Sequence, residues 1–186
     1  MKKQDVTIRI QATPNPSAWK FVLECPVLLD GKATYSDEKE AAGNRLVKDL
    51  FAIEGVKQVH LFQNVITVSH RFDSDSDEIQ KQVSAVIQTR LPTHDPKIGV
   101  KESAMESRKS LPEEIQKIEM ILDRTIRPGL QGDGGDIEVV KYEDNQLFVS
   151  YQGACGTCPS STTGTLMAIE GILRDEFNPE IEIIPV

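Results

Sequence analysis

Long apolar stretches are missing from this sequence of 186 residues. No run of about 18 consecutive apolar residues occurs, which excludes a membrane-spanning helix. The first ten residues lack the apolar core of a secretory signal and the Arg- and Ser-rich composition of a transit peptide. We therefore expect a cytoplasmic protein with no membrane partner. A protein of an organelle matrix whose leader has been removed would have the same composition.

Aromatic residues and cysteines are also scarce. Aromatics make up 5% of the chain, although 39% hydrophobic residues are enough to build a core. The three cysteines are Cys25, Cys155 and Cys158. An odd, small number argues against a disulfide framework and fits a reducing compartment, where a close pair of thiols is more often a metal or redox site.

Basic residues become rare in the second half of the chain. Residues 1–110 carry 16 basic and 15 acidic side chains, whereas residues 111–186 carry 5 and 14, so the net charges are +1 and −9. The acidic half would repel a phosphate backbone, which makes nucleic acid an unsuitable partner. The asymmetry also indicates two separate units.

Residues 1–92 alternate between predicted strands and helices and form the first expected α+β domain. The helical face of Leu46, Val47 and Leu50 belongs to a helix that we expect to begin with Ser36 as its N-cap. A second helix is predicted over residues 74–91. Period-2 patterns predict strands over residues 6–11, 20–23, 56–62 and 65–70, the last two joined by a hairpin at residues 63–64.

Residues 93–110 show no sustained periodicity, and we interpret them as a flexible linker. Residues 111–186 form the second expected domain, a small α+β unit of order α-β-β-α-β. Its first helix starts around Pro112 and is closed by Arg127-Pro128-Gly129. After a tight turn at residues 132–136 we expect strands at 137–142 and 146–151, joined by a hairpin at residues 143–145, then a helix at 159–177 and a strand at 181–184.

The segment Gly153-Ala-Cys-Gly-Thr-Cys-Pro-Ser160 carries the chemistry. Two residues between Cys155 and Cys158 allow both sulfurs to face one metal centre. Pro159 suits the first position of a helix, and the positive end of that helix favours thiolate, the form that binds metal.

Three interpretations of this pair remain open: structural cysteines, a thioredoxin-like thiol–disulfide oxidoreductase, and a metal site. A tetrahedral zinc site or a cubane iron–sulfur cluster uses four ligands, and this chain offers two. Cys25 lies in the other domain, and the three histidines are more typical of surface or half-buried positions: His60, His70 and His94. Two chains that meet across a two-fold axis would supply four thiolates, which suit an iron–sulfur cluster or a bridging zinc ion.

The Gly132-Asp-Gly-Gly-Asp136 turn lacks the Lys and Ser/Thr of a phosphate-binding loop and is too short for a calcium-binding EF-hand loop. We expect its glycines to serve the backbone between helix and strand. Asp133 or Asp136 could cap a backbone turn beside the cysteine loop.

The residues of the second domain resemble the C-terminal domain of NifU/Nfu-type iron–sulfur scaffold and carrier proteins. The similarity rests on four segments: Ile126-Arg-Pro-Gly-Leu-Gln-Gly-Asp-Gly-Gly-Asp136, Gly153-Ala-Cys-Gly-Thr-Cys-Pro-Ser-Ser161, Thr165-Leu-Met and Ile169-Glu170. In the first domain, Thr13-Pro-Asn-Pro16 and Lys20-Phe21 look like the domain that precedes it in Nfu proteins.

This resemblance implies a non-enzymatic carrier with a [4Fe–4S] cluster, held by Cys155 and Cys158 of each of two subunits. Four thiolates also accept a [2Fe–2S] cluster, so the residues themselves leave the cluster type open. The implied partners are a second copy of the chain when the cluster is bound, upstream assembly machinery as donor, and apo iron–sulfur proteins as recipients.

Overall fold

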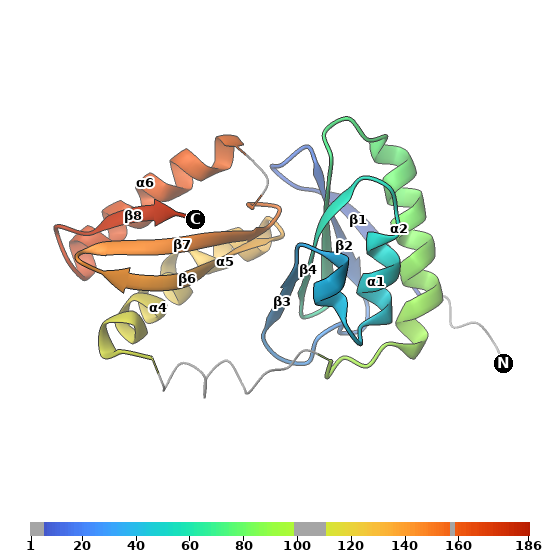
Figure 1. Cartoon of the computed structure of the whole chain (residues 1–186), viewed down its shortest axis with the longest axis horizontal. Helices are drawn as coiled ribbons and strands as arrows, with labels where there is room; N and C mark the ends of the chain where they lie inside the picture. Colours follow the sequence, from blue (N-terminus) through green and yellow to red (C-terminus); the bar gives the residue numbers. More distant parts are fainter. Residues whose placement is uncertain (1–5, 99–110, 157–158) are drawn as a thin grey trace.

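Two hydrophobic cores, each with its own β-sheet, organise the computed structural model of the chain (Figure 1). It describes residues 6–98, 111–156 and 159–186. The expected α+β class is confirmed. The exact domain limits stay a prediction, and residues 99–110 of the expected linker lie outside the described residues. Residues shortly before this gap contact the first domain, since Leu29 N donates to Pro96 O at 3.1 Å.

Helices and short strands alternate in the first half. The elements are β1 (Ile8–Ala12), β2 (Ala18–Leu23), β3 (Lys32–Tyr35), η1 (Glu38–Ala41), α1 (Arg45–Phe51), β4 (Val56–Phe62), β5 (Val65–His70), α2 (Ser76–Arg90) and η2 (Leu91–Thr93). The five strands form one antiparallel sheet of order β1-β2-β5-β4-β3.

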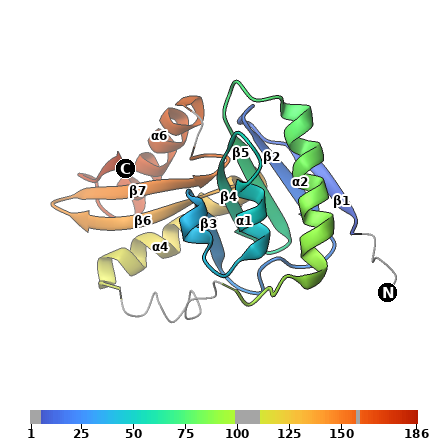
Figure 2. The same ribbon diagram turned by 45° about the vertical axis from the view of Figure 1, so that its right-hand side comes forward.

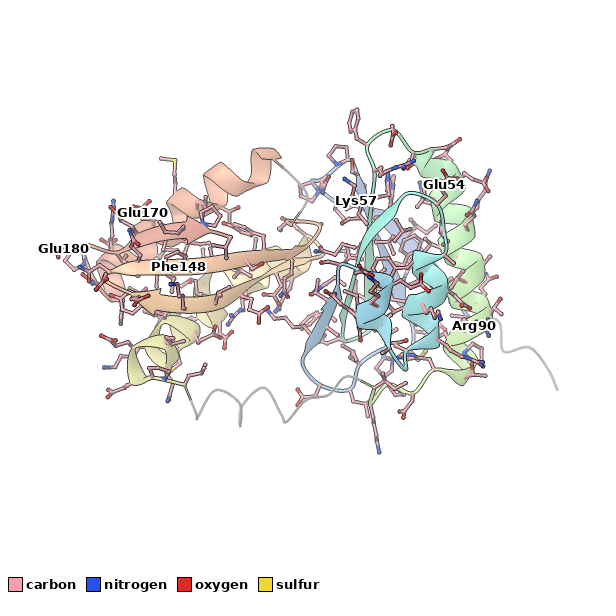
Figure 3. All side chains as sticks on the ribbon, viewed as in Figure 1. Glu54, Lys57, Arg90, Phe148, Glu170 and Glu180 are labelled. Carbon is pink, nitrogen blue, oxygen red and sulfur yellow. The ribbon has the colours of Figure 1, made fainter. Side chains whose placement is uncertain are left out.

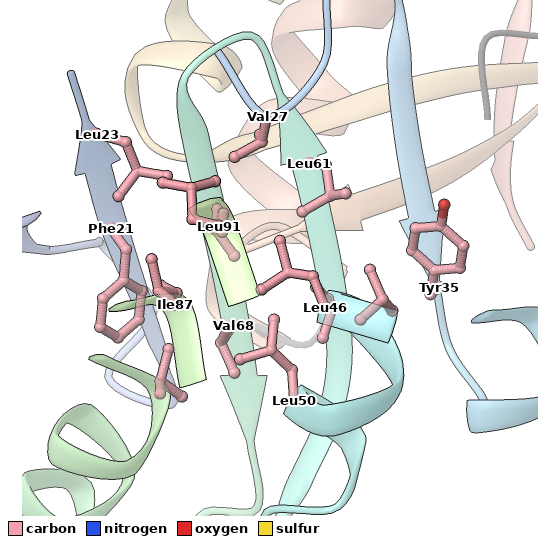
Figure 4. Packing of buried hydrophobic residues seen from close by; sticks show 14 of the residues in the cluster. Phe21, Leu23, Val27, Tyr35, Leu46, Leu50, Leu61, Val68, Ile87 and Leu91 are labelled. Carbon is pink, nitrogen blue, oxygen red and sulfur yellow. The ribbon is translucent and has the colours of Figure 1, made fainter. Parts of the chain in front are cut away.

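The two faces of this sheet differ in chemistry because successive side chains of a strand alternate. One face carries paired apolar residues such as Phe21, Ile66 and Leu61, and α1 and α2 cover it (Figure 4). The other carries mainly polar residues, which the strand register places side by side. We call this the polar face, defined by Lys20, Lys32, Thr34, Gln58, His60, Thr67 and Ser69.

Two expectations for this half were wrong. Strand β3 was not predicted, because its four residues are too few for a periodic pattern. No helix begins at Ser36 either. The short η1 is capped by Asp37, the chain turns at Gly43 with φ +87°, and Asn44 then caps α1 by accepting from Val47 N at 3.2 Å.

The second half contains α4 (Glu113–Thr125), α5 (Arg127–Gly132), β6 (Gly135–Glu143), β7 (Gln146–Gly153), α6 (Pro159–Glu176) and β8 (Glu182–Pro185). Strands β6 and β7 form a hairpin through Asp144 and Asn145, both with positive φ, and β8 runs parallel to β7. Helices α4 and α6 pack on the face that holds Leu147 and Val149, while Phe148 lies on the other face (Figure 3).

Helix α4 ends at Thr125, just before the Arg127-Pro128-Gly129 segment that was expected to close it. The sequence did not predict the second short helix, α5, which this segment begins and which ends at Gly132. Pro128 stands near the start of α5, where the N–H that proline lacks would have no helical partner. Among the described residues, no helix is long and apolar enough to cross a membrane.

Candidate functional site

Cys155 lies two residues beyond the end of β7, in a turn that Gly156 N closes by donating to Gly153 O at 3.2 Å. The turn is held against the end of α5, because Ala154 N donates to Gly134 O at 3.1 Å. Cys155 is 8% exposed and belongs to the second hydrophobic core. Cys158 lies outside the described residues. Helix α6 then begins at Pro159, as the sequence predicted.

Two glycines make room for this turn. A Cβ on Gly135 would lie 2.4 Å from Cys155 Sγ and 3.0 Å from Cys155 N. Gly153 has φ +64°, and a Cβ there would lie 2.5 Å from Gly134 O. The glycine-rich turn of the sequence therefore serves the backbone, and in particular it allows the Cys155 side chain to lie directly on the first residue of β6.

Tyr151, on β7, supplies the nearest phenol to this cysteine. Burial, and secondarily the negative charge of a Cys155 thiolate, raise the pKa of Tyr151 to about 12. Its hydroxyl is buried and has no hydrogen-bond partner among the described residues. The site thus keeps a neutral, protonated phenol beside the sulfur.

A buried network of ion pairs centred on Arg127 lies near the Cys155 turn. The Arg127 guanidinium, 5% exposed, donates to both carboxylate oxygens of Glu119, at 2.8 and 3.1 Å, and to Asp123 at 2.5 Å. Its Nε lies 3.4 Å from the Asp136 carboxylate. Burial alone would lower the pKa of Arg127, but these carboxylates raise it on balance, so the guanidinium stays charged.

Asp136 links this network to the other domain. Lys32 Nζ, from the polar face, lies 3.1 Å from Asp136 Oδ1 and donates to Ile137 O at 2.9 Å. Asp136 is 1% exposed, so the contact is shielded on the carboxylate side. Burial lowers the pKa of Lys32, and the charge of Asp136 counteracts that shift.

Other side chains of the polar face contact the end of β7 and the end of α5, and the ribbon shows this end of β7 beside the first sheet (Figure 2). Ser69 Oγ donates to Gly153 O at 3.4 Å, and Thr34 Oγ1 donates to Gln152 Oε1 at 2.9 Å. Lys20 Nζ donates to Gly132 O. From the loop before β2, the Asn15 side-chain amide donates to Ala154 O at 2.9 Å.

His60 is a second deeply buried titratable group of this interface. The residue is 2% exposed, and Nδ1 lies 2.8 Å from Thr34 Oγ1. Burial lowers the pKa of His60 to about 4; Asp136 acts in the opposite direction and Lys32 in the same direction. His60 is therefore neutral at physiological pH.

Of the residues singled out from the sequence, the structure brings Cys155 and Asp136 to the same end of the second domain. Asp136 acts mainly as an ion-pair partner of Arg127. Its carboxylate also accepts a hydrogen bond from Ile137 N. Cys25 is exposed in the first domain. His60 and His70 are buried on strands, contrary to a surface position, and His94 Nε2 lies 2.8 Å from Val27 O.

No group of three or more His, Cys, Asp or Glu side chains within the described ranges is arranged to hold a metal ion. The residues that sequence reasoning missed are those of the polar face. The sequence pattern that could have revealed them is the regular alternation of polar and apolar residues in three strands. This alternation makes one face of the sheet polar.

The structure thus defines a two-domain α+β protein with a cysteine loop at the domain interface. Residues 8–94 match the family described as the Nfu/NifU scaffold protein N terminus, and residues 118–184 match the NifU-like domain family. The chain belongs to the NifU/Nfu family.

Curated relatives align with nearly the whole chain. An Arabidopsis thaliana protein named NifU-like protein 4, mitochondrial, is 29% identical over 92% of this chain and 63% of its own length. A Drosophila willistoni protein named NFU1 iron-sulfur cluster scaffold homolog, mitochondrial, is 32% identical over 99% of this chain and 64% of its own length. The chain therefore spans slightly less than two thirds of these relatives. A solved NifU-like protein from Saccharomyces cerevisiae is 19% identical, with a TM-score of 0.47, over 55% of this chain and 92% of that one.

Proposed function

We propose that this chain binds an iron–sulfur cluster through Cys155 and Cys158, shares it with a second copy, and delivers it to apo-proteins. The observation that carries the proposal is the position of Cys155 in a turn cleared by Gly135 and Gly153, shortly before α6 begins at Pro159. The names of its relatives, iron–sulfur cluster scaffold and NifU-like protein, support the same cargo.

The start of α6 explains why thiolate would form here. The unpaired N–H groups of a helix N-terminus favour negative charge and lower the pKa of nearby thiols. Thiolate sulfur is the ligand that iron–sulfur clusters use in proteins. Two cysteines per chain supply half of a four-ligand set, so a second copy completes it.

Sharing between subunits also suits delivery. A cluster held by two thiolates from each of two chains can be released one ligand at a time to the thiolates of an apo-protein. Upstream assembly machinery is the donor in this scheme. We favour a [4Fe–4S] cargo, and four thiolates accept a [2Fe–2S] cluster as well.

The proposed cellular compartment is taken from the names of the relatives. Both curated relatives described above carry the word mitochondrial in their names. This supports an organelle matrix as the site of action, and the cytoplasm remains the prediction from composition.

Anaerobic reconstitution with iron and sulfide tests the proposed cargo. We expect brown protein with equal amounts of iron and sulfide. Cys155→Ser and Cys158→Ser should each abolish cluster binding, whereas Cys25→Ser, in an exposed loop of the other domain, serves as the control and should retain it. Loss of the cluster in Cys25→Ser would overturn the ligand assignment.

The two alternative functions give different results in the same samples. Colourless protein that reduces insulin disulfides would support a thiol–disulfide oxidoreductase, and colourless protein with bound zinc would support a zinc-bridged interaction module. Either result would exclude the carrier function.

A further inference from the structure

The first domain covers the cysteine loop of the second. Ala154, the neighbour of Cys155, accepts a buried hydrogen bond from Asn15 at 2.9 Å. The small cavity beside Cys155 is bordered by Pro14 and Asn15 as well as by residues of the second domain. Cys155 itself is 8% exposed. In this arrangement, Pro14 and Asn15 of the first domain occupy part of the space beside the Cys155 loop.

We propose that the polar face and the Asn15 loop form an intramolecular cap, which competes with a second copy of the chain for the Cys155 loop. This inference rests on the proposed function, because the competition matters only where two chains share a cluster. The capped form is then the cluster-free state, and displacement of the cap accompanies pairing of two chains around the cargo.

Charge holds the cap in place. The first half of the chain has a net charge of +1 and the second half −9, and the contacts between them follow this difference. Lys32 pairs with Asp136 at 3.1 Å, and Lys20 donates to Gly132 O. Since Lys32 is 25% exposed, salt reaches its side of the pair, and the attraction weakens as ionic strength rises.

The cap is also incompletely bonded, which favours its release. Three buried polar atoms on the polar face have no hydrogen-bond partner among the described residues: Gln58 Oε1, His60 Nε2 and Thr67 Oγ1. Each such atom destabilises the closed arrangement, because it has lost its hydrogen bonds to water. When the cap opens, water can bond to these atoms again and the cost disappears. A permanent interface would more commonly satisfy these atoms, so the contact suits a reversible closure.

The rate of thiol labelling in the cluster-free protein measures how often the cap opens. In a Cys25→Ser, Cys158→Ser background, Cys155 is the one remaining thiol, and its rate of reaction with a maleimide reports opening. We expect Lys32→Glu, which places a carboxylate beside Asp136, to raise this rate about tenfold. The isosteric Thr34→Val removes one interdomain hydrogen bond and should raise it about threefold.

A matched charge change on the far side of the sheet is the control. Lys81→Glu lies on α2, which covers the apolar face, and should leave the labelling rate unchanged. Sodium chloride should speed labelling of the protein that keeps Lys32, and it should not speed labelling of Lys32→Glu. Equal rates for Lys81→Glu, Thr34→Val and Lys32→Glu, with far-UV circular dichroism showing all three folded, would overturn the cap.

Cluster assembly in the chain with all three cysteines separates this inference from the proposed function. Lys32→Glu should acquire the cluster faster than the unchanged chain and reach the same final content. Equal assembly rates would remove the competition while leaving the carrier function intact. Failure of both proteins to bind any cluster, together with cap-dependent labelling, would reject the carrier function and retain the cap only as a structural contact.

Discussion

Gly135 and Cys155 illustrate, at the scale of single residues, how a backbone position fixes a side chain. The Cys155 sulfur occupies the space that a Cβ on Gly135 would fill, at 2.4 Å. The glycine-rich turn before β6 is thus explained by its contact with a loop about twenty residues later in the chain. A side chain at Gly135 would displace the Cys155 turn rather than unfold the domain.

Gly135→Ala should therefore disturb cluster binding more than stability. Overpacking at this contact costs about 1–3 kcal/mol, and a displacement of the Cys155 side chain from β6 would relieve part of it. Iron and sulfide per chain after reconstitution should fall several-fold. Gly171→Ala on α6, where a Cβ meets nothing within 4 Å, is the matched control and should bind normally. A full cluster content in Gly135→Ala would contradict this account of the turn.

His60 makes the interface sensitive to acid. Its folded pKa is about 4, below the ordinary value of 6.5, so the folded state favours the neutral ring. The unfolded chain takes up a proton first as pH falls, and stability is complete above 6.5 and lost between 6.5 and 4. Asp136 and Lys32 are the charged groups that act on the ring.

The free energy of unfolding should accordingly fall by about 1.3 kcal/mol through His60 alone between pH 7.5 and pH 5.5. Urea titrations at the two pH values measure this. His60→Gln, which keeps a hydrogen-bonding group near Thr34 and does not titrate, should reduce the difference by that amount. His94→Gln is the control, and an equal reduction in both variants would show that His60 is not responsible.

The chemistry of the cysteine loop could be predicted from sequence because it depends on neighbouring residues: glycine, two cysteines and the proline that begins α6. The burial of His60 could not. Gly153, where an added Cβ would lie 3.3 Å from the His60 ring, is about ninety residues away, and no local pattern marks such a contact.

At the scale of elements, Arg127 joins α4, α5 and β6. It contacts Glu119 and Asp123 on α4 while it begins α5, and its Nε lies near Asp136 on β6. This network connects the start of α5 to both α4 and β6. A buried guanidinium with several carboxylate partners also fixes the angle between the helices.

Arg127→Leu should destabilise the second domain by about 3–5 kcal/mol, because Glu119 would remain buried without its counter-charge and Asp136 would keep only Lys32. Chemical denaturation followed by circular dichroism measures this loss. Arg124→Leu provides the comparison: Arg124 is 67% exposed and pairs with Glu176, so its loss should cost less than about 1 kcal/mol. Similar losses in the two variants would refute the role of the buried network.

The start of α1 depends on one buried cap. Asn44 is 1% exposed, and its Oδ1 accepts from Val47 N. Asn44→Ala should lower the free energy of unfolding of the first domain by about 1 kcal/mol. Asp37→Ala, at the exposed start of η1, should have a smaller effect. Thermal melts of both variants compare them, and equal shifts would contradict the importance of the Asn44 cap.

Hairpins were the elements that sequence predicted best. Residues 63–64 and 144–145 combine turn residues with strong flanking strands, and these signals are local. The break between η1 and α1 was missed because Ser36 offers an equally good cap in sequence. Asn44 is the cap that the fold uses, and the helix that starts at Arg45 buries Leu46, Val47 and Leu50 in the core.

At the scale of the whole molecule, the two domains meet through the polar face, and this contact was not foreseen. The charge difference between the halves indicated two units but not that they would dock. Family resemblance supplied the cargo, while the contacts of Lys32, Thr34 and Asn15 supply a relation between the domains that resemblance did not contain.

The central claim is that one cluster is shared by two chains through Cys155 and Cys158 of each. Native mass spectrometry of the anaerobically reconstituted protein tests it most directly. We predict a dimer that carries one cluster, and no cluster in mixed dimers formed with a tagged Cys155→Ser, Cys158→Ser chain. A single chain that retains a complete cluster by itself would contradict the account.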